Sequence, residues 1–241
     1  MAVRVARAIV MTFVRSAVFN LVFFGFTTLM AFPATLIRWF APHRLRGFIQ
    51  TWAGVLVGSL RVICGVRVVV TGWEHVPSGA ALIVSHHESA FDTLIWLLLL
   101  PGCRYVLKRE LLRIPLVGSL ITALGMIAVD RSGGAAAMRV LMREGQRVAG
   151  EGGQMVIFPE GTRAPAGTVL PLQPGFLALA ARTHLPIVPV RTDSGRCWAR
   201  RGFWKYPGTI RIDIRPPLAP DLPRADIMRR LHDEFAAGPG G

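Results

Sequence analysis

The sequence predicts an α/β domain that follows a pair of apolar, membrane-embedded N-terminal helices. Three observations predict this fold class: long uncharged runs lie before residue 62, short β-branched runs alternate with helical runs after residue 66, and a chain of 241 residues suits one good-sized core. We therefore expect a membrane-embedded helical hairpin at 1–62, an α/β domain at 63–237 and a loose tail at 238–241.

The composition is that of a protein in contact with lipid. Hydrophobic residues make up 52% of the chain and charged residues only 17%, which is too apolar for an ordinary cytosolic enzyme. The formal net charge is +14, and eight arginines precede the first acidic residue, Glu74. Basic residues beside apolar runs suit an anionic lipid surface, and they lack the aromatic alternation of a nucleic-acid platform. We expect membrane lipids as partners and no nucleic acid.

Two uncharged runs define the N-terminal segment. Residues 16–37 can cross a hydrocarbon core, which takes about 20 residues, whereas the shorter run 47–60 indicates an interfacial or re-entrant helix. His43, Arg44 and Arg46 lie between the runs and favour the same side of the membrane as the basic N-terminus. We favour a hairpin at 5–62 in one leaflet of the cell inner membrane, with the active site on the cytoplasmic face. One ordinary transmembrane anchor is the alternative.

The rest of the chain alternates strand-length and helix-length segments, as α/β domains do. Strands are predicted at 66–70, 81–85, 104–107, 126–129, 155–158, 187–190 and 210–214. Helices are predicted at 93–100, 116–124, 135–148, 175–183 and 225–236.

A polar cluster follows the predicted strand 81–85 directly. Ser89 and Asp92 have the spacing of a capping box, which predicts a helix that begins at Ser89 and a turn that folds His87 back onto Asp92. The carboxylate would then orient the imidazole and leave its other nitrogen free to act as a base. The alternative is a helix cap beside an ordinary loop histidine. Adjacent His86 hints at a metal, but no third ligand is nearby and the three cysteines are far apart, so we expect no metal site.

A second polar cluster follows the predicted strand 155–158 and contains Pro159, Glu160, Gly161, Thr162 and Arg163. Arg163 offers a planar fork of donors that suits a phosphate, and the main-chain amides near Gly161 can add to it. The alternative is an exposed arginine that forms an ion pair with Glu160.

Together the two clusters resemble two sequence blocks of the glycerolipid acyltransferase superfamily, and of its lysophosphatidic acid acyltransferases in particular. The first is His-x-x-x-x-Asp at 87–92, and the second is Phe-Pro-Glu-Gly-Thr-Arg at 158–163. Two weaker blocks, at 125–131 and 185–190, stand in the expected order. The resemblance covers roughly residues 66–217.

The resemblance implies a glycerolipid acyltransferase-like mixed sheet flanked by helices, with His87 and Asp92 at the catalytic centre. It further implies that the substrate is bound by residues of the later blocks, namely Glu160, Gly161, Thr162, Arg163, Arg131 and Lys108. Lys108 is expected near the oxyanion, with an ordinary surface lysine as the alternative. Glu88 stands where many relatives carry a neutral polar residue.

The implied reaction moves a fatty acyl group from a thioester to the sn-2 hydroxyl of lysophosphatidic acid and gives phosphatidic acid. No Gly-x-Ser-x-Gly motif occurs, so we expect direct transfer without a cofactor. The partners would be a lysophospholipid acceptor and acyl-CoA or acyl carrier protein as donor, which a basic face at Arg139, Arg143 and Arg147 would dock. Two alternatives stay open: another acceptor, such as a lyso-ornithine lipid, and a non-catalytic membrane scaffold.

Overall fold

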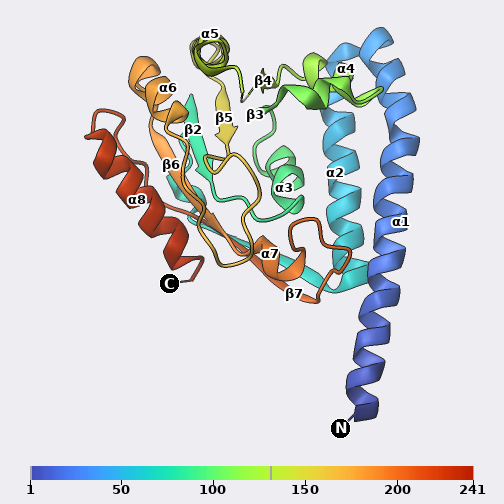
Figure 1. Cartoon of the computed structure of the whole chain (residues 1–241). Coiled ribbons are helices and arrows are strands. Elements are labelled where there is room, and N and C mark those ends of the chain that lie inside the picture. Colours follow the sequence, from blue (N-terminus) through green and yellow to red (C-terminus); the bar gives the residue numbers. More distant parts are fainter. Residues whose placement is uncertain (1, 131, 241) are drawn as a thin grey trace.

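The structure is a computed structural model that describes residues 2–130 and 132–240. It contains a mixed β-sheet with helices on both faces (Figure 1). Its strands are β1 (Val66–Thr71), β2 (Ala81–Ser85), β3 (Arg104–Lys108), β4 (Ile127–Val129), β5 (Gln154–Ile157), β6 (Ile187–Thr192) and β7 (Gly208–Ile214). The longer helices are α1 (Ala2–Phe40), α2 (Pro42–Cys64), α3 (Phe91–Leu99), α4 (Val117–Ala123), α5 (Gly134–Gly150), α6 (Gly175–Thr183) and α8 (Arg224–Ala237).

Every predicted strand and helix of the α/β domain is confirmed, with ends that move by at most two residues. Three short helical turns were not predicted, namely η1 (Trp73–His75), η2 (Arg109–Arg113) and α7 (Ser194–Cys197). Each is shorter than two turns of an α-helix and therefore carries too few residues for a periodic apolar pattern.

The strand order is β1-β7-β6-β2-β5-β3-β4, and all pairs are parallel except β6 with β7, which are antiparallel. All five residues of β2 are buried, as expected for a central strand that is covered on both faces. Because β2, β3 and β5 run in the same direction, the segments that follow them meet at one edge of the sheet.

Two hydrophobic cores cover the two faces of the sheet. One core joins the sheet to α2, α3 and part of α1, and includes Phe19, Leu56, Phe91 and Trp96. The other joins the opposite face to α5, α6 and α8, and includes Leu141, Phe176, Leu179 and Leu231. The sheet edge between these cores holds the polar clusters.

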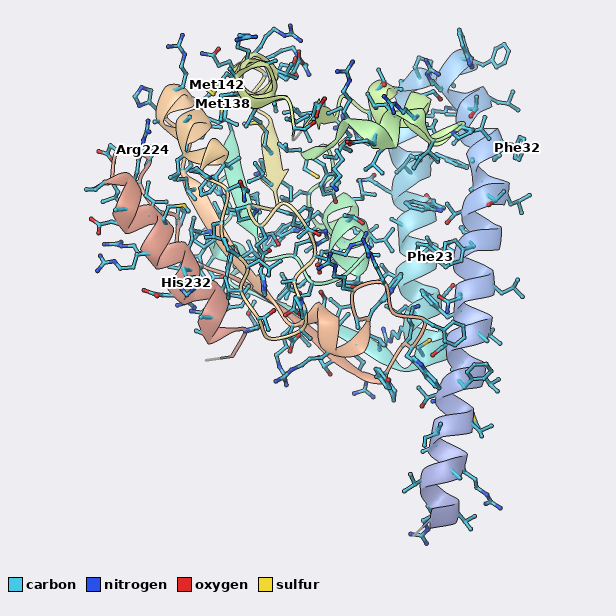
Figure 2. The ribbon with its side chains drawn as sticks, in the orientation of Figure 1. Phe23, Phe32, Met138, Met142, Arg224 and His232 are labelled. Carbon is cyan, nitrogen blue, oxygen red and sulfur yellow. The ribbon has the colours of Figure 1, made fainter. Side chains whose placement is uncertain are left out.

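The two N-terminal helices pack side by side at one margin of the domain, and the first turns of α1 extend beyond the end of α2 (Figure 1). Both helices are long and apolar enough to cross a membrane. Figure 2 shows Phe23 on the side of α1 that faces the domain and Phe32 on the outer side, where it is 60% exposed. An exposed apolar face of this length is typical of a helix that associates with a membrane.

Helix α2 is longer than the uncharged run 47–60 indicates, because His43, Arg44 and Arg46 belong to the helix instead of separating two helices. Pro42 occupies the first turn, where its missing N–H costs nothing. The helix ends at Gly65, whose φ of 71° is a left-handed conformation that glycine adopts without strain, and the chain turns there into β1.

Candidate active site

The predicted site residues gather at the carboxyl edge of three neighbouring strands. His87 and Asp92 follow β2, Lys108 ends β3, and the segment 158–163 follows β5. His87, Lys108, Thr162 and Arg163 line one cavity of about 400 Å³. Arg131 lies outside the described residues.

One carboxylate oxygen organises the turn between β2 and α3. Oδ2 of Asp92 accepts hydrogen bonds from Nδ1 of His87 and from the main-chain N–H groups of Glu88 and Ser89, each at 2.9 Å. Ser89 in turn accepts a bond from the N–H of Phe91 through its hydroxyl, at 3.1 Å. One bond of the predicted capping box is therefore present, from the Ser89 N–H to Asp92, whereas the Ser89 hydroxyl accepts from Phe91 instead of Asp92. Helix α3 begins at Phe91, two residues after Ser89, because residues 89 and 90 form the turn.

Asp92 therefore acts both as a cap and as the partner of the histidine, so the two readings of this residue do not compete. The carboxylate is 2% exposed, and its bond to Nδ1 implies that this nitrogen carries the hydrogen. The imidazole stacks on Phe158, with ring centroids 4.0 Å apart. No described residue hydrogen-bonds to Nε2, and the ring lines the cavity, so Nε2 is available there as a proton acceptor.

The second cluster supports the first from the neighbouring strand. Glu160 Oε2 accepts a bond from the main-chain N–H of His87 at 2.9 Å, and its Oε1 lies 3.0 Å from Nε2 of His86. Ala164 donates its N–H to the carbonyl of His87 at 2.7 Å. The turn that carries the histidine is thus fixed at its N–H, its carbonyl and its ring.

Glu160 and Gly161 both bond within the protein, and both line the cavity between α5 and α6. The side chain of Glu160 has no exposed surface and bonds to the histidine turn, so the alternative ion pair with Arg163 is not formed. The N–H of Gly161 is already donated to the carbonyl of Phe158 at 3.0 Å, in a turn for which the glycine has a φ of 71°, so this amide is not free for a phosphate. The His87 partner of Glu160 lies 73 residues away in the chain, so no local pattern indicates this contact.

Glu88 and His86 connect the site to the surrounding loops. Glu88 is buried and accepts the N–H groups of Gly167 at 2.7 Å and Gly195 at 2.8 Å, one with each oxygen. Burial raises the pKa of this carboxyl group above its usual value. His86 lies 3.1 Å from the carbonyl of Thr168 and stacks on a ring of α8. Both side chains therefore tie the turn after β2 to neighbouring loops.

The cavity is strongly cationic. Arg163 is partly buried in its wall, and burial lowers the pKa of its guanidinium, an effect that Asp92 opposes and the neighbouring Arg200 and Arg201 reinforce. Arg200 and Arg201 line the same cavity and were not predicted. The sequence feature that could have indicated them is a pair of adjacent arginines followed by three aromatic residues, at 200–206.

Two further cavities adjoin the cationic one. An almost wholly apolar cavity of about 270 Å³ lies among α1, α2, α3 and α4 and shares Thr93, Tyr105 and Leu107 with it. A third, of about 550 Å³, lies between α5 and α6 and shares Phe158, Gly161 and Thr162 with it. An apolar cavity and a cavity of mixed polarity thus adjoin the cationic cavity that His87 lines.

Within residues 2–130 and 132–240, no group of three or more His, Cys, Asp and Glu side chains is arranged to hold a metal ion. Cys64, Cys103 and Cys197 are free and buried.

Comparisons with known proteins agree on one family. A family model described as Acyltransferase matches residues 67–193. The chain is 35% identical over 195 residues to 1-acyl-sn-glycerol-3-phosphate acyltransferase of Pseudomonas aeruginosa, covering 81% of this chain and 75% of that protein. It is also 35% identical to the enzyme of the same name from Limnanthes douglasii, covering 76% and 67%.

A solved structure has the same fold. The crystal structure of the 1-acyl-sn-glycerophosphate (LPA) acyltransferase from Thermotoga maritima superposes with a TM-score of 0.71 at 22% identity, over 97% of this chain and 95% of that one. The likeness includes the N-terminal helices as well as the α/β domain, because nearly the whole of both chains is covered.

Proposed function

Since the chain belongs to the Acyltransferase family, we propose that it moves a fatty acyl group from a thioester to the sn-2 hydroxyl of lysophosphatidic acid and produces phosphatidic acid. The observation that carries this function is the His87–Asp92 pair, whose free nitrogen opens into a cavity lined by cations. A base beside a cationic pocket is what an acceptor with one hydroxyl and one phosphate requires.

The imidazole acts on the acceptor hydroxyl. Nε2 of His87 removes the hydroxyl proton as the oxygen attacks the thioester carbonyl, and a new C–O bond forms. The C–S bond then breaks, and the imidazolium returns the proton to the departing thiolate. Asp92 stabilises the imidazolium through Nδ1, and Lys108 faces the same cavity to receive the developing negative charge.

We propose direct transfer without an acyl-serine intermediate and without a cofactor, and the bonds of two nearby serine hydroxyls support the first part. Ser85 donates its hydroxyl to the carbonyl of His86 at 3.0 Å, and the Ser89 hydroxyl is held by the N–H of Phe91. Neither serine is therefore positioned as a nucleophile for Nε2 to activate. The acceptor and the donor must then be bound at the same time.

The polarity of the three cavities suggests how both substrates fit. Arg163 holds the acceptor phosphate, and the apolar cavity among α1 to α4 takes an acyl chain. The cavity between α5 and α6 leaves a route for the donor, acyl-CoA or acyl carrier protein, from the side opposite the N-terminal helices.

The expected basic docking face on α5 is smaller than the sequence indicates. Arg143 forms an ion pair with Glu144, and Arg147 pairs with both Glu144 and Glu151. These carboxylates offset much of the positive charge, so Arg139 is the residue of this face that remains for an acidic donor.

The acceptor assignment is tested by Arg163→Lys, which keeps the charge and removes the bidentate fork. We expect kcat/KM for lysophosphatidic acid to fall about tenfold or more, the worth of a charge-assisted hydrogen bond. The assay uses purified protein, both donors, and lysophosphatidic acid or a lyso-ornithine lipid. Arg182→Lys, at an exposed position of α6 that does not line the cavity, is the matched control and should leave kcat/KM unchanged. A wild-type preference for the ornithine lipid would refute the phosphate acceptor, and no turnover with any pair of substrates would favour the scaffold.

We further propose that α1 and α2 lie as a hairpin in one leaflet of the inner membrane, with the active site on the cytoplasmic face. His43→Cys places a thiol at an exposed position of the α1–α2 connection, while the native cysteines are buried. A membrane-impermeant maleimide should label this cysteine in inside-out vesicles and leave it unlabelled in intact cells. Labelling from outside would mean that the helices cross the membrane. The wild-type protein controls for background labelling.

A further inference from the structure

We propose that Arg200 and Arg201 form a second anion-binding wall of the active site, which holds the phosphate of the lysolipid acceptor opposite Arg163. The inference rests on the proposed function and adds to it two residues beyond the matched family segment, which ends at residue 193. The loop that carries them, residues 198–207, is called the arginine loop below.

The first support is unbalanced charge. Arg163, Arg200, Arg201 and Lys108 line the cavity that His87 opens into. No carboxylate of residues 2–130 or 132–240 lies within ion-pairing distance of these four cations. Asp92, whose charge acts on Arg163, already accepts three hydrogen bonds on one oxygen. Four like charges that no carboxylate pairs with repel one another, and a bound anion relieves that repulsion.

The second support is the chemistry of the anion that these cations would bind. A phosphate monoester carries a charge of about −1.5 to −2 at neutral pH and offers three acceptor oxygens, more than a phosphodiester head group does. Guanidinium groups bind such oxygens in pairs, and several of them can surround one phosphate. Lysophosphatidic acid carries a phosphate monoester, and the phosphates of the acyl donor are the other source of this chemistry.

The position of the arginine loop favours the lipid. Phe203 and Trp204 pack on Phe13 of α1, with ring centroids at 5.3 and 5.7 Å, and Tyr206 stacks on Trp204. Phe203 and Tyr206 are 42% and 48% exposed. Exposed aromatic rings beside an apolar helix are typical of the lipid–water interface, where lipid phosphates lie. Arg200 and Arg201 therefore meet the head group of a lysolipid that is still in the membrane.

Helix α1 holds the arginine loop in place through Lys205. This residue is 2% exposed; its amine donates to Oδ1 of Asn20 at 2.7 Å and stands 4.8 Å from the ring centre of Trp198. Its main-chain N–H donates to the hydroxyl of Ser16 at 2.9 Å, and Nδ2 of Asn20 donates to the carbonyl of Phe203 at 2.9 Å. A membrane helix thus sets where the two arginines stand.

The backbone of Arg201 has a φ of 54°, a left-handed conformation that is uncommon for arginine. The anchors on α1 hold the chain on the far side of this turn. Such conformations persist where the surrounding structure over-determines them, and they cluster at ligand-binding positions.

The test measures KM for each substrate in Arg200→Gln, Arg201→Gln and the double variant of the full-length protein in nanodiscs. We expect KM for lysophosphatidic acid to rise about tenfold in each single variant and further in the double variant, as for a lost charge-assisted bond. KM for the donor should not change. Arg196→Gln is the matched control, because Arg196 is exposed on the adjacent α7 and does not line the cavity, so its KM values should remain those of the wild type.

A rise in the donor KM alone would overturn the inference and assign the arginines to the donor phosphates. No change in either KM would also overturn it. So would an equal rise in KM for a lysolipid that lacks a phosphate monoester. Wild-type turnover of lysophosphatidic acid in the same assay decides the proposed function separately. Asn20→Ala tests the anchor on α1, and should raise KM for lysophosphatidic acid in the same direction without removing a cation from the cavity. An unchanged KM in this variant would refute the anchoring role.

Discussion

Replacement of His87 by alanine is expected to lower kcat for acyl transfer by about 10²- to 10⁴-fold, the usual contribution of a positioned general base. Nε2 is the proton acceptor that the cavity offers to the acceptor hydroxyl, and water cannot replace it at the same position. Initial rates with saturating lysophosphatidic acid and acyl donor measure the effect. Membrane association and thermal melting of the variant show whether the fold is intact.

His87→Asn is the matched variant for this prediction. Its side-chain amide can still donate to Oδ2 of Asp92, so the turn keeps its hydrogen bond while the base is lost. We expect His87→Asn to be as inactive as His87→Ala but closer to the wild type in thermal stability. Activity within about tenfold of the wild type in His87→Asn would show that the imidazole is structural and that the base lies elsewhere.

Replacement of Asp92 by asparagine is expected to lower kcat by about 10²-fold or more with little change in KM, because the charge that stabilises the imidazolium is lost. The amide oxygen of asparagine can accept the same three bonds that Oδ2 accepts, from His87, Glu88 and Ser89. The turn should therefore survive, and the melting temperature should stay near that of the wild type. Wild-type kcat in Asp92→Asn would mean that only the cap is needed.

Asp92→Ala separates the two roles of this carboxylate. It leaves three donors at a 2%-exposed position without an acceptor, and each unpaired buried donor costs about 1–3 kcal/mol of stability. We expect this variant to melt at a clearly lower temperature than Asp92→Asn, although both lose activity. Equal melting temperatures would show that the cap bonds contribute little.

The sequence by itself determined the elements of the fold, because the signals involved are local. β-branched runs and helical periodicity located every strand of the sheet and every long helix of the α/β domain within two residues. The spacing of Ser89 and Asp92 predicted a helix start and a turn that brings His87 to Asp92, since all three residues lie in one local segment. The uncharged run gave the wrong limits for α2, because this helix continues through the basic residues of its first turns.

The tertiary structure decided what depends on contacts between distant segments. A glutamate at position 160 could bind substrate, Arg163 or a main-chain amide, and the sequence alone does not distinguish these partners. The parallel pairing of β5 with β2 brings Glu160 to the N–H of His87. Arg200 and Arg201 reach the cavity because Lys205 fastens their loop to Asn20, 185 residues earlier in the chain. Strand register and the anchoring of loops depend on packing between distant segments. No local sequence pattern therefore predicts the positions of these side chains.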